Sequence, residues 1–459
     1  MSTVGLSFGS IAGGTGFDVN ATVTSILSIE QGIETPWKTQ LTTLKAQDTA
    51  FSTFGTDLSA LSTALQSLTD FTGVLASKQG SSSNTSVIAL TSASSAAVAG
   101  SHSISMTSLA QTSSNYSSRI ATASDTLSGS LSLQVGSGVS HTIAVDPNNP
   151  TLAGLAAAIN AAGVGVTANV VTDTLGSRLS LVSGTSGAGG QITLSSAVTD
   201  TTTGAAMTFA TGQLGADAVL NVDGLDTTSA SNTVTGVIPG VTFQLLSSSA
   251  GASTPVQVQI TNDNSSIATA LGSFVTAYNA VVSDIKTQEG KDASGNAQPL
   301  FGNTTLALIQ NQLSMGLLGG AASGSISSIT QMGLSVGLDG KLTLNAADLD
   351  TALNTKFGDV TGFLQNSGSF GLTFKTALNG LSSTSTTGAL YLAQQENTAQ
   401  EATLNQSIAD EETRIAADKV RLTAELNTAN QILQSIPNQL NEVDQIYSAV
   451  TGYNRSTTG

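Results

Sequence analysis

The residues that could carry acid–base or nucleophilic chemistry are few in this chain. It has 459 residues, of which two are histidines, His102 and His141, and none is a cysteine. A serine–histidine–aspartate triad would need one of these two histidines as its base. His141 lies in a strand-like stretch near Asp146, and His102 follows Gly100, which is interpreted as a turn. Both histidines are interpreted as strand-surface residues. A serine nucleophile is also not indicated, since no Gly-x-Ser-x-Gly elbow sits at a strand-to-helix transition.

Paired carboxylates are the other catalytic option, because a glycosidase needs only two of them. Asp223 and Asp226 are candidates, but they lie in a predicted hairpin turn, where Asp commonly binds the local backbone. The Asn-Asp-Asn run at 262–264 lacks the alternating acids and closing Glu of a calcium loop, so it is interpreted as a helix cap. The Gly-rich stretch 185–191 lacks the Lys of a phosphate loop. The sequence therefore predicts no catalytic, cofactor-binding or metal-binding residue, and no enzyme.

The charge balance narrows the classes of partner. Only 10% of the residues are charged, and 30 acidic residues outnumber 14 basic ones, which gives a net charge of −16. This argues against binding to nucleic acid or to an anionic membrane surface, both of which need clustered Lys and Arg. No run of eighteen apolar residues occurs, and residues 1–20 contain no Lys or Arg. We therefore expect no membrane-spanning helix and no cleaved secretory signal.

Two segments with apolar residues at heptad spacing lie near the ends of the chain. The first comprises Trp37, Leu41, Leu44, Phe51, Leu58, Leu61, Leu65 and Leu68, and the second comprises Ile408, Ile415, Leu422, Ala429, Leu433, Ile436, Leu440, Val443, Tyr447 and Val450. An apolar stripe of this kind needs a partner helix to cover it. The two ends are expected to pair, within one chain or between copies, as in an assembly subunit.

The remaining pattern predicts helices that flank a region of strands. Residues 1–20 are Gly/Ser-rich and are expected to be disordered until assembly orders them. A helix is expected from Asp18, as N-cap, until a break at Thr35-Pro36. Strand-like alternation begins near residue 80, and Asp223-Gly224 and Asp339-Gly340 indicate hairpins. After Asp263 the pattern returns to that of helices.

The predicted fold is therefore a multidomain α+β protein, with a terminal α-helical coiled-coil stalk and inserted antiparallel β-rich domains. Residues 1–44 form a disordered and helical segment that pairs with 426–459. A helical stalk domain with a small hairpin combines 45–79 and 263–425. One β-rich domain combines 80–118 and 213–262, and a second β-rich domain, 119–212, is inserted into it.

Several stretches resemble the flagellar hook-associated protein 2 family, whose members cap flagellar filaments. GSIAGGTGFDVNATVTSILSIE (9–30) is similar to the N-terminal opening of that family. TLAGLAAAINAAGVGVTANVV (151–171), with RLSLVSGTSG (178–187), looks like the flagellin hook IN motif, and Ile159-Asn160 supplies its namesake pair. The stretch from NVDG to FVTAYNAVVSDI, and the terminal heptads, are similar to the C-terminal region of the family. One departure is Pro437, which would kink a continuous helix.

The resemblance implies a function without a chemical step. It implies export through the flagellar type III route and assembly into a pentamer-like homo-oligomeric ring at the distal tip of the bacterial flagellum. Flagellin, hook–filament junction proteins and an export chaperone at the C-terminal helix are the implied partners, with no cofactor, nucleic acid or membrane. The alternatives are another axial protein, such as a junction protein or flagellin, or a secreted adhesin or glycan-active β protein.

Contacts with neighbouring subunits are expected at the outer ends of the two heptad segments, toward the chain termini from Pro36 and Pro437. The residues expected to make contacts, five of them on the inner side of these prolines, are Ile26, Ile29, Ile33, Trp37, Leu41, Leu44, Leu433, Ile436, Leu440, Val443, Tyr447 and Val450.

Overall fold

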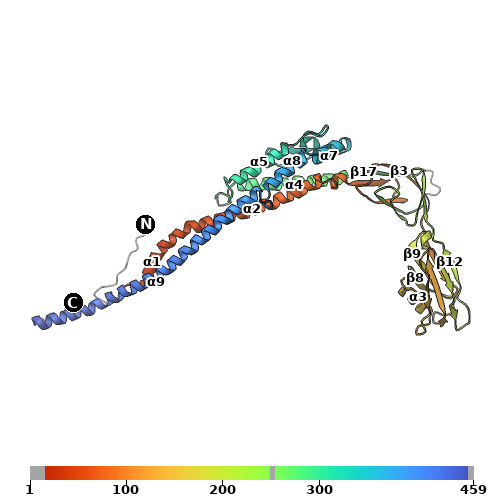
Figure 1. The fold of residues 1–459 in the computed structure, drawn as a ribbon, viewed down its shortest axis with the longest axis horizontal. Coiled ribbons are helices and arrows are strands. Elements are labelled where there is room, and N and C mark those ends of the chain that lie inside the picture. Colours follow the sequence, from red (N-terminus) through yellow and green to blue (C-terminus); the bar gives the residue numbers. More distant parts are fainter. Residues whose placement is uncertain (1–15, 249–253, 453–459) are drawn as a thin grey trace. The chain divides into compact units, whose positions relative to one another are not determined.

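The computed structural model describes residues 16–248 and 254–452 and divides the chain into two compact units. Unit 1 combines Met1–Thr69 with Ala268–Gly459, and unit 2 is Asp70–Ile267. Helices are the first and last elements of the described residues, and antiparallel sheets lie between them in the sequence (Figure 1). The predicted fold class is confirmed. Residues 1–15, most of the segment predicted to be disordered, lie outside the described residues.

Unit 1 is built mainly from helices. In chain order its elements are α1 (Val19–Glu30), the 3-10 turn η2 (Gln31–Ile33), α2 (Glu34–Thr69), α4 (Asn264–Gln288), α5 (Thr304–Leu318), η5 (Ile329–Met332), β18 (Leu334–Val336), β19 (Leu342–Leu344), α6 (Ala346–Thr355), α7 (Phe357–Gln365), α8 (Phe370–Leu381) and α9 (Ala389–Thr451). The break after the first helix comes at η2 rather than at Thr35-Pro36, because Gly32 weakens the helix there. Pro36 instead lies in the first turn of α2, where its missing N–H needs no partner.

Side-chain caps set several helix starts, and the one at Asp18 was predicted from the sequence. The Asp18 carboxylate accepts a hydrogen bond from the Ala21 N–H at 3.0 Å and opens α1. The Asn303 side chain does the same for α5. Each cap satisfies an N–H group that has no partner within its helix, so the helix start is encoded locally.

The core of unit 1 contains a cluster of aromatic rings. Phe363 stacks on Phe370, with ring centroids 5.3 Å apart, and Phe370 stacks on Phe374 at 5.7 Å. Phe274 of α4 meets Phe374 edge-on. Among the described helices, α4 alone is long and apolar enough to cross a membrane, although the sequence predicted no such helix. Since Phe274 and Tyr278 are almost fully buried, α4 has the character of a core helix.

Unit 2 is built from short strands and one helix. The strands are β1 (Lys78–Ser82), β2 (Ile88–Ala93), β3 (Gly100–Ser108), β4 (Thr112–Ser117), β5 (Leu127–Ser128), β6 (Ser130–Val135), β7 (His141–Ala144), β8 (Val166–Asp173), β9 (Gly176–Ser186), β10 (Ile192–Ser196), β11 (Thr199–Asp200), β12 (Phe209–Gln213), β13 (Ala218–Val222), β14 (Leu225–Ser229), β15 (Thr233–Thr235), β16 (Val241–Leu245) and β17 (Val256–Asn262). The helix is α3 (Leu152–Ala161), and η3 (Val74–Ala76) and η4 (Ala188–Gly190) are 3-10 turns.

Every pairing between named strands of unit 2 is antiparallel, and the buried residues form two separate clusters. The largest sheet has the order β1-β17-β3-β13-β14, and a four-stranded sheet has the order β12-β4-β9-β8. One cluster draws its buried residues from 88–110 and 218–260, and the other draws them from 120–207. All residues of the second cluster therefore lie in the sequence between the two parts of the first cluster. The first strand begins at Lys78, so a boundary at residue 80 falls inside β1.

Two local features of unit 2 follow directly from the sequence. Asp223 and Gly224 both have positive φ, 53° and 87°, and join β13 to β14 as the predicted two-residue hairpin. Asn160, at the end of α3, accepts from the Ala168 N–H and donates to the Ala168 carbonyl, both at 2.8 Å. The Asn of the IN pair thus ties the helix to β8. Gly100 is the first residue of β3 and does not form the predicted turn.

Candidate assembly surface

The two ends of the chain pair as antiparallel helices in unit 1. Val19, Val23 and Leu27, spaced by four residues, are the buried face of α1. They pack against Ile415, with Phe17, Leu422 and Leu426 partly buried beside them. The backbone N–H of Phe17 also donates to the Asn430 side chain at 2.9 Å. Residues 17–27 therefore pair within one chain, but with residues 415–430 rather than with the predicted segment 426–459.

Further along, α2 packs against the first half of α9 (Figure 1). Leu44, Phe51 and Leu58 of α2 are buried in this stretch. One contact in the seam is polar, because the buried Asn397 side chain donates to the Asp48 carboxylate at 2.8 Å. A polar pair inside an apolar seam fixes the register of the two helices, since any shift leaves it unpaired.

The residues predicted to contact neighbours fall into three groups. Leu44 is buried within the chain. Half-buried are Ile26, Trp37, Leu41, Leu433 and Ile436. Exposed are Ile29, Ile33, Leu440, Val443, Tyr447 and Val450. The sequence prediction missed Val19 and Val23, which carry the pairing with α9, and Ile446, which is 64% exposed. Their spacing in VNATVTSIL was the signal that could have found Val19 and Val23.

The last three turns of α9 expose an uncovered apolar face. Leu440, Val443, Tyr447 and Val450 follow one another at spacings of three, four and three residues, and each is more than half exposed. The helix continues through Pro437 as far as Thr451. An exposed stripe of this length is typical of a surface that another helix covers.

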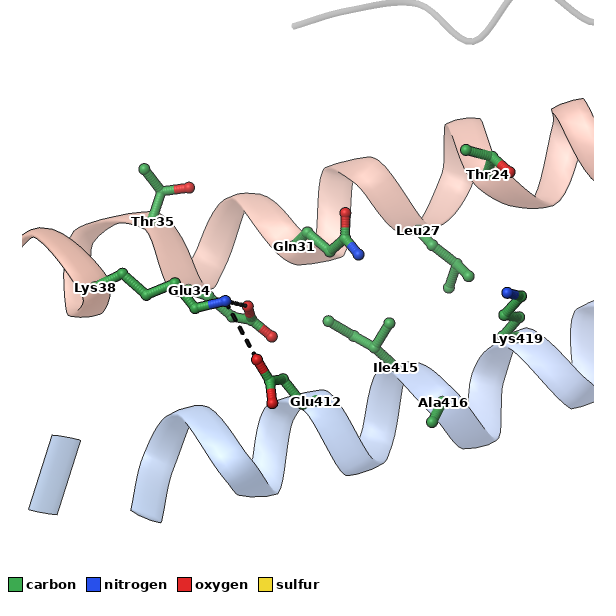
Figure 2. A pocket seen from close by; sticks show the side chains of 10 residues that line it. All are labelled: Thr24, Leu27, Gln31, Glu34, Thr35, Lys38, Glu412, Ile415, Ala416 and Lys419. Atoms are coloured by element: carbon green, nitrogen blue, oxygen red, sulfur yellow. Dashed lines mark hydrogen bonds and ion pairs between the residues drawn. The ribbon is translucent and has the colours of Figure 1, made fainter. Parts of the chain in front are cut away.

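A hollow of about 670 Å³ lies where the paired helices separate at η2. Its lining is Thr24, Leu27, Gln31, Glu34, Thr35, Lys38, Glu412, Ile415, Ala416 and Lys419. Figure 2 shows Leu27 and Ile415 pointing toward each other across the gap. At one end the Lys38 ammonium lies 2.5 Å from Glu34 and 3.3 Å from Glu412. The hydrogen bond with Glu34, followed by that with Glu412, raises the pKa of Lys38.

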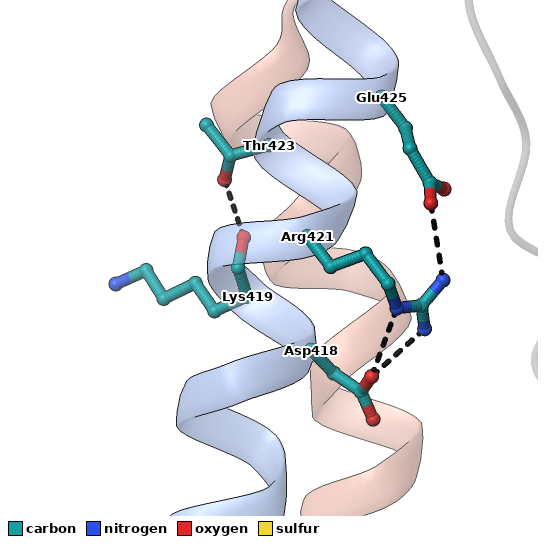
Figure 3. A network of polar contacts seen from close by, with 5 residues as sticks. All are labelled: Asp418, Lys419, Arg421, Thr423 and Glu425. Atoms are coloured by element: carbon teal, nitrogen blue, oxygen red, sulfur yellow. Dashed lines mark hydrogen bonds and ion pairs between the residues drawn. The ribbon is translucent and has the colours of Figure 1, made fainter.

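Ion pairs line the outer surface of α9. Arg421 donates to Asp418 at 2.8 Å and lies 3.4 Å from Glu425 (Figure 3). Arg414 pairs with Glu411 two turns earlier. All of these pairs lie within one helix, with the arginines exposed to solvent, so they add little to helix stability.

The candidate catalytic residues have local structural partners. The Nδ1 atom of His102 lies 2.7 Å from the Asp223 carboxylate, which also accepts from the Ser103 N–H at 2.8 Å. His102 first, and then the Ser103 N–H, hold the pKa of Asp223 below its usual range. Asp226 accepts from the Asn221 side chain at 2.7 Å within the same hairpin. These contacts stabilise the hairpin. Among the described residues, no three potential metal ligands lie close together.

One partly buried acidic pair lies between two helices of unit 1. Burial, followed by hydrogen bonding with Asp57, raises the pKa of Asp284 to about 6. Asp57 is on α2 and Asp284 is on α4. Two carboxyl groups this close cannot both ionise without cost, so the protonated form of Asp284 is favoured.

Family models match most of the chain in the order that the sequence suggested. The N-terminus of flagellar hook-associated protein 2 matches residues 15–113, and its C-terminus matches residues 215–438. The flagellin hook IN motif matches residues 130–185, which contain α3 and Asn160. The first two matches together cover the helices and the first β-rich cluster, and the third lies within the inserted cluster.

Individual relatives and a solved structure agree with these matches. The B-type flagellar hook-associated protein 2 of Pseudomonas aeruginosa is 30% identical over 75% of this chain and 78% of its own length. Flagellar hook-associated protein 2 of Escherichia coli K12 is 28% identical over 84% of this chain and 86% of its own. The crystal structure of the D1-D2-D3 domains of the E. coli flagellar cap protein FliD superposes with a TM-score of 0.60, at 25% identity, over 76% of this chain and 99% of that chain. The chain belongs to the flagellar hook-associated protein 2 family.

Proposed function

We propose that this chain is a subunit of the cap at the distal end of a bacterial flagellar filament. The observation that carries the proposal is the apolar face that α9 leaves exposed over Leu440, Val443, Tyr447 and Val450. A helix end of this kind is incomplete in a single chain and is covered when copies or axial partners pack against it. Family membership supplies the place where such packing would occur.

The subunit contacts are proposed at the twelve residues predicted from the heptads. The six that are exposed, Ile29, Ile33, Leu440, Val443, Tyr447 and Val450, are available to a neighbour directly. Leu44 is buried within the single chain, so its effect on subunit contacts would be indirect, through the packing of α2 against other helices of the same chain. The half-buried residues would border the contact.

The assembly is proposed to be a homo-oligomeric ring that promotes insertion of flagellin and prevents its loss. Junction proteins between hook and filament, and an export chaperone at the C-terminal helix, are the further proposed partners. We also propose that the two β-rich clusters of unit 2 are separate domains, 80–118 with 213–262 and 119–212, because their buried residues do not mix. Function would then lie in surfaces, without a catalytic step.

Immunogold electron microscopy of intact flagellated cells tests the proposal. Antibody against this chain should label one spot at the free end of each filament. Label along the whole filament would identify a flagellin instead, and label at its base would identify a junction protein. Either pattern would contradict the cap assignment. Label on the cell body alone would favour an adhesin.

A further inference from the structure

The hollow between α1–α2 and α9 has the shape of a binding groove for a helix. Thr24, Leu27 and Gln31 lie along one wall at spacings of three and four residues. Glu412, Ile415 and Lys419 lie along the other wall at the same spacings. Two antiparallel helices with facing rows of this kind leave holes that the side chains of a third helix can fill.

One polar atom in this groove lacks a partner. The Glu34 side chain is 5% exposed, and its Oε2 atom pairs with Lys38. Its Oε1 atom is buried and accepts no hydrogen bond from the described residues. Leaving such an atom unpaired costs about 1–3 kcal/mol. Because Lys38 already neutralises the carboxylate, the missing partner is a neutral donor, such as the amide of Asn or Gln.

The groove also presents a free cation. Lys419 lies on its lining, and its ammonium forms no ion pair with the part of the chain that the structure describes. Figure 3 shows the Lys419 side chain pointing away from the Asp418–Arg421–Glu425 network. An occupant of this groove would therefore bring apolar side chains, an amide donor and a negative charge.

The same chain carries a helix with these three properties. We call residues 440–450 of α9 the distal segment. Its apolar face, Leu440, Val443, Tyr447 and Val450, has the spacing of the groove walls and is exposed. It contains two acids, Glu442 and Asp444, and no Lys or Arg, and its amides include Asn441 and Gln445. Neither acid forms an ion pair among the described residues.

We propose that the distal segment of one copy binds in the groove between α1–α2 and α9 of a second copy. The apolar face would cover Leu27 and Ile415, an amide would reach Glu34 Oε1, and Asp444 or Glu442 would pair with Lys419. This contact joins two different surfaces, so each copy keeps one groove and one distal segment free for further copies. Head-to-tail contacts of this type form a ring when the rotation from copy to copy closes. The proposal rests on the proposed cap function and names the contact that builds its ring.

Disulfide trapping tests the contact, because the chain contains no cysteine of its own. An Ala416→Cys variant is mixed with a Val443→Cys variant under oxidising conditions, and covalent dimers are counted on a non-reducing gel. We expect dimers in the mixture and not in either variant alone. Ala417 is exposed and lies on the side of α9 away from Glu412, Ile415 and Lys419, so it provides the matched control. Ala417→Cys mixed with Val443→Cys should give no dimers.

Charge exchange provides a second measurement on the intact surface. Lys419→Glu and Asp444→Lys should each raise the dissociation constant of self-association about fivefold, since each places like charges together. The double variant should restore it to within about twofold. Lys45→Glu, an exposed change outside the groove, should leave it unchanged. Sedimentation velocity measures all four variants.

The results separate this inference from the proposed function. If the chain sediments as an assembly while Ala416→Cys and Val443→Cys fail to join, or Val443→Cys joins to itself, the groove contact is wrong and the cap proposal stands. If the chain stays monomeric in solution at every concentration, and is also monomeric at the filament tip, both the groove contact and the cap proposal are wrong.

Discussion

At the residue scale, single polar side chains hold the elements in place. Asn160 binds both backbone groups of Ala168, which is 2% exposed, and thereby joins α3 to β8. The Asp18 cap was predicted from the sequence, because a helix cap depends only on neighbours in the chain. The pairing of Asn160 with Ala168 was not predicted. The Asp57–Asp284 pair and the unpaired Glu34 oxygen could not be predicted. They arise only when distant helices meet.

Asn160→Ala should destabilise the inserted β-rich cluster by about 2 kcal/mol, because the buried N–H and C=O of Ala168 lose their partner. Asn160→Asp keeps the acceptor and loses the donor, so it should cost less. Urea unfolding followed by circular dichroism measures both. An Asn160→Ala variant as stable as the parent chain would show that water replaces the amide.

Asp284 predicts a pH dependence of stability. Its folded pKa of about 6 lies above the value of about 3.9 for an unfolded Asp, so the folded chain binds more protons between these values. The contribution of this group to stability therefore falls as pH rises from about 4 to 6. Asp284→Asn should be more stable than the parent by about 1 kcal/mol at pH 7, with no gain at pH 4. Equal gains at both pH values in thermal unfolding would contradict this account.

At the element scale, the terminal helices show which features of helix pairing a heptad pattern predicts. It correctly predicts that the two ends pair, because an apolar stripe must be covered. It does not predict which stripe of α1 meets α9, because α1 carries apolar residues on more than one face. Val19, Val23 and Leu27 are buried against α9, whereas Ile29 and Ile33 remain exposed. The hollow at η2 also depends on how two helices separate, which no local pattern encodes.

The Asp48–Asn397 pair should set the register of α2 and α9. Asn397→Ala leaves the Asp48 carboxylate without its donor and should cost about 1–3 kcal/mol in chemical denaturation. The double variant Asp48→Ala/Asn397→Ala should recover part of that loss, because no charge is left unpaired. Strictly additive costs would mean that the two side chains do not interact.

At the scale of the whole molecule, one unit folds inside the sequence of the other. Unit 2 leaves unit 1 after Thr69, and the chain returns to it at Ala268. The sequence indicates this nesting through the order of helix, strand and helix patterns. The distal segment buries few apolar side chains in the monomer. Changes to it should therefore affect assembly without affecting the stability of the folded monomer.

Truncation after Gln439 should therefore leave the thermal unfolding midpoint within about 1–2 °C of the parent, because the removed apolar residues are exposed. The same truncation should abolish self-association. Leu27→Ala, a buried change, is the contrasting variant and should lower the stability of the helical pair by about 2–4 kcal/mol. Calorimetry and sedimentation measure the two effects. A large loss of stability on truncation would place the distal segment in the monomer core.

The cap function itself is tested most directly in a strain from which this gene has been deleted. Filament length is measured by electron microscopy, and flagellin in the medium is measured by immunoblot. The account predicts short or absent filaments, monomeric flagellin in the medium, and recovery of both on complementation with the intact gene. Filaments of normal length with no released flagellin would contradict it.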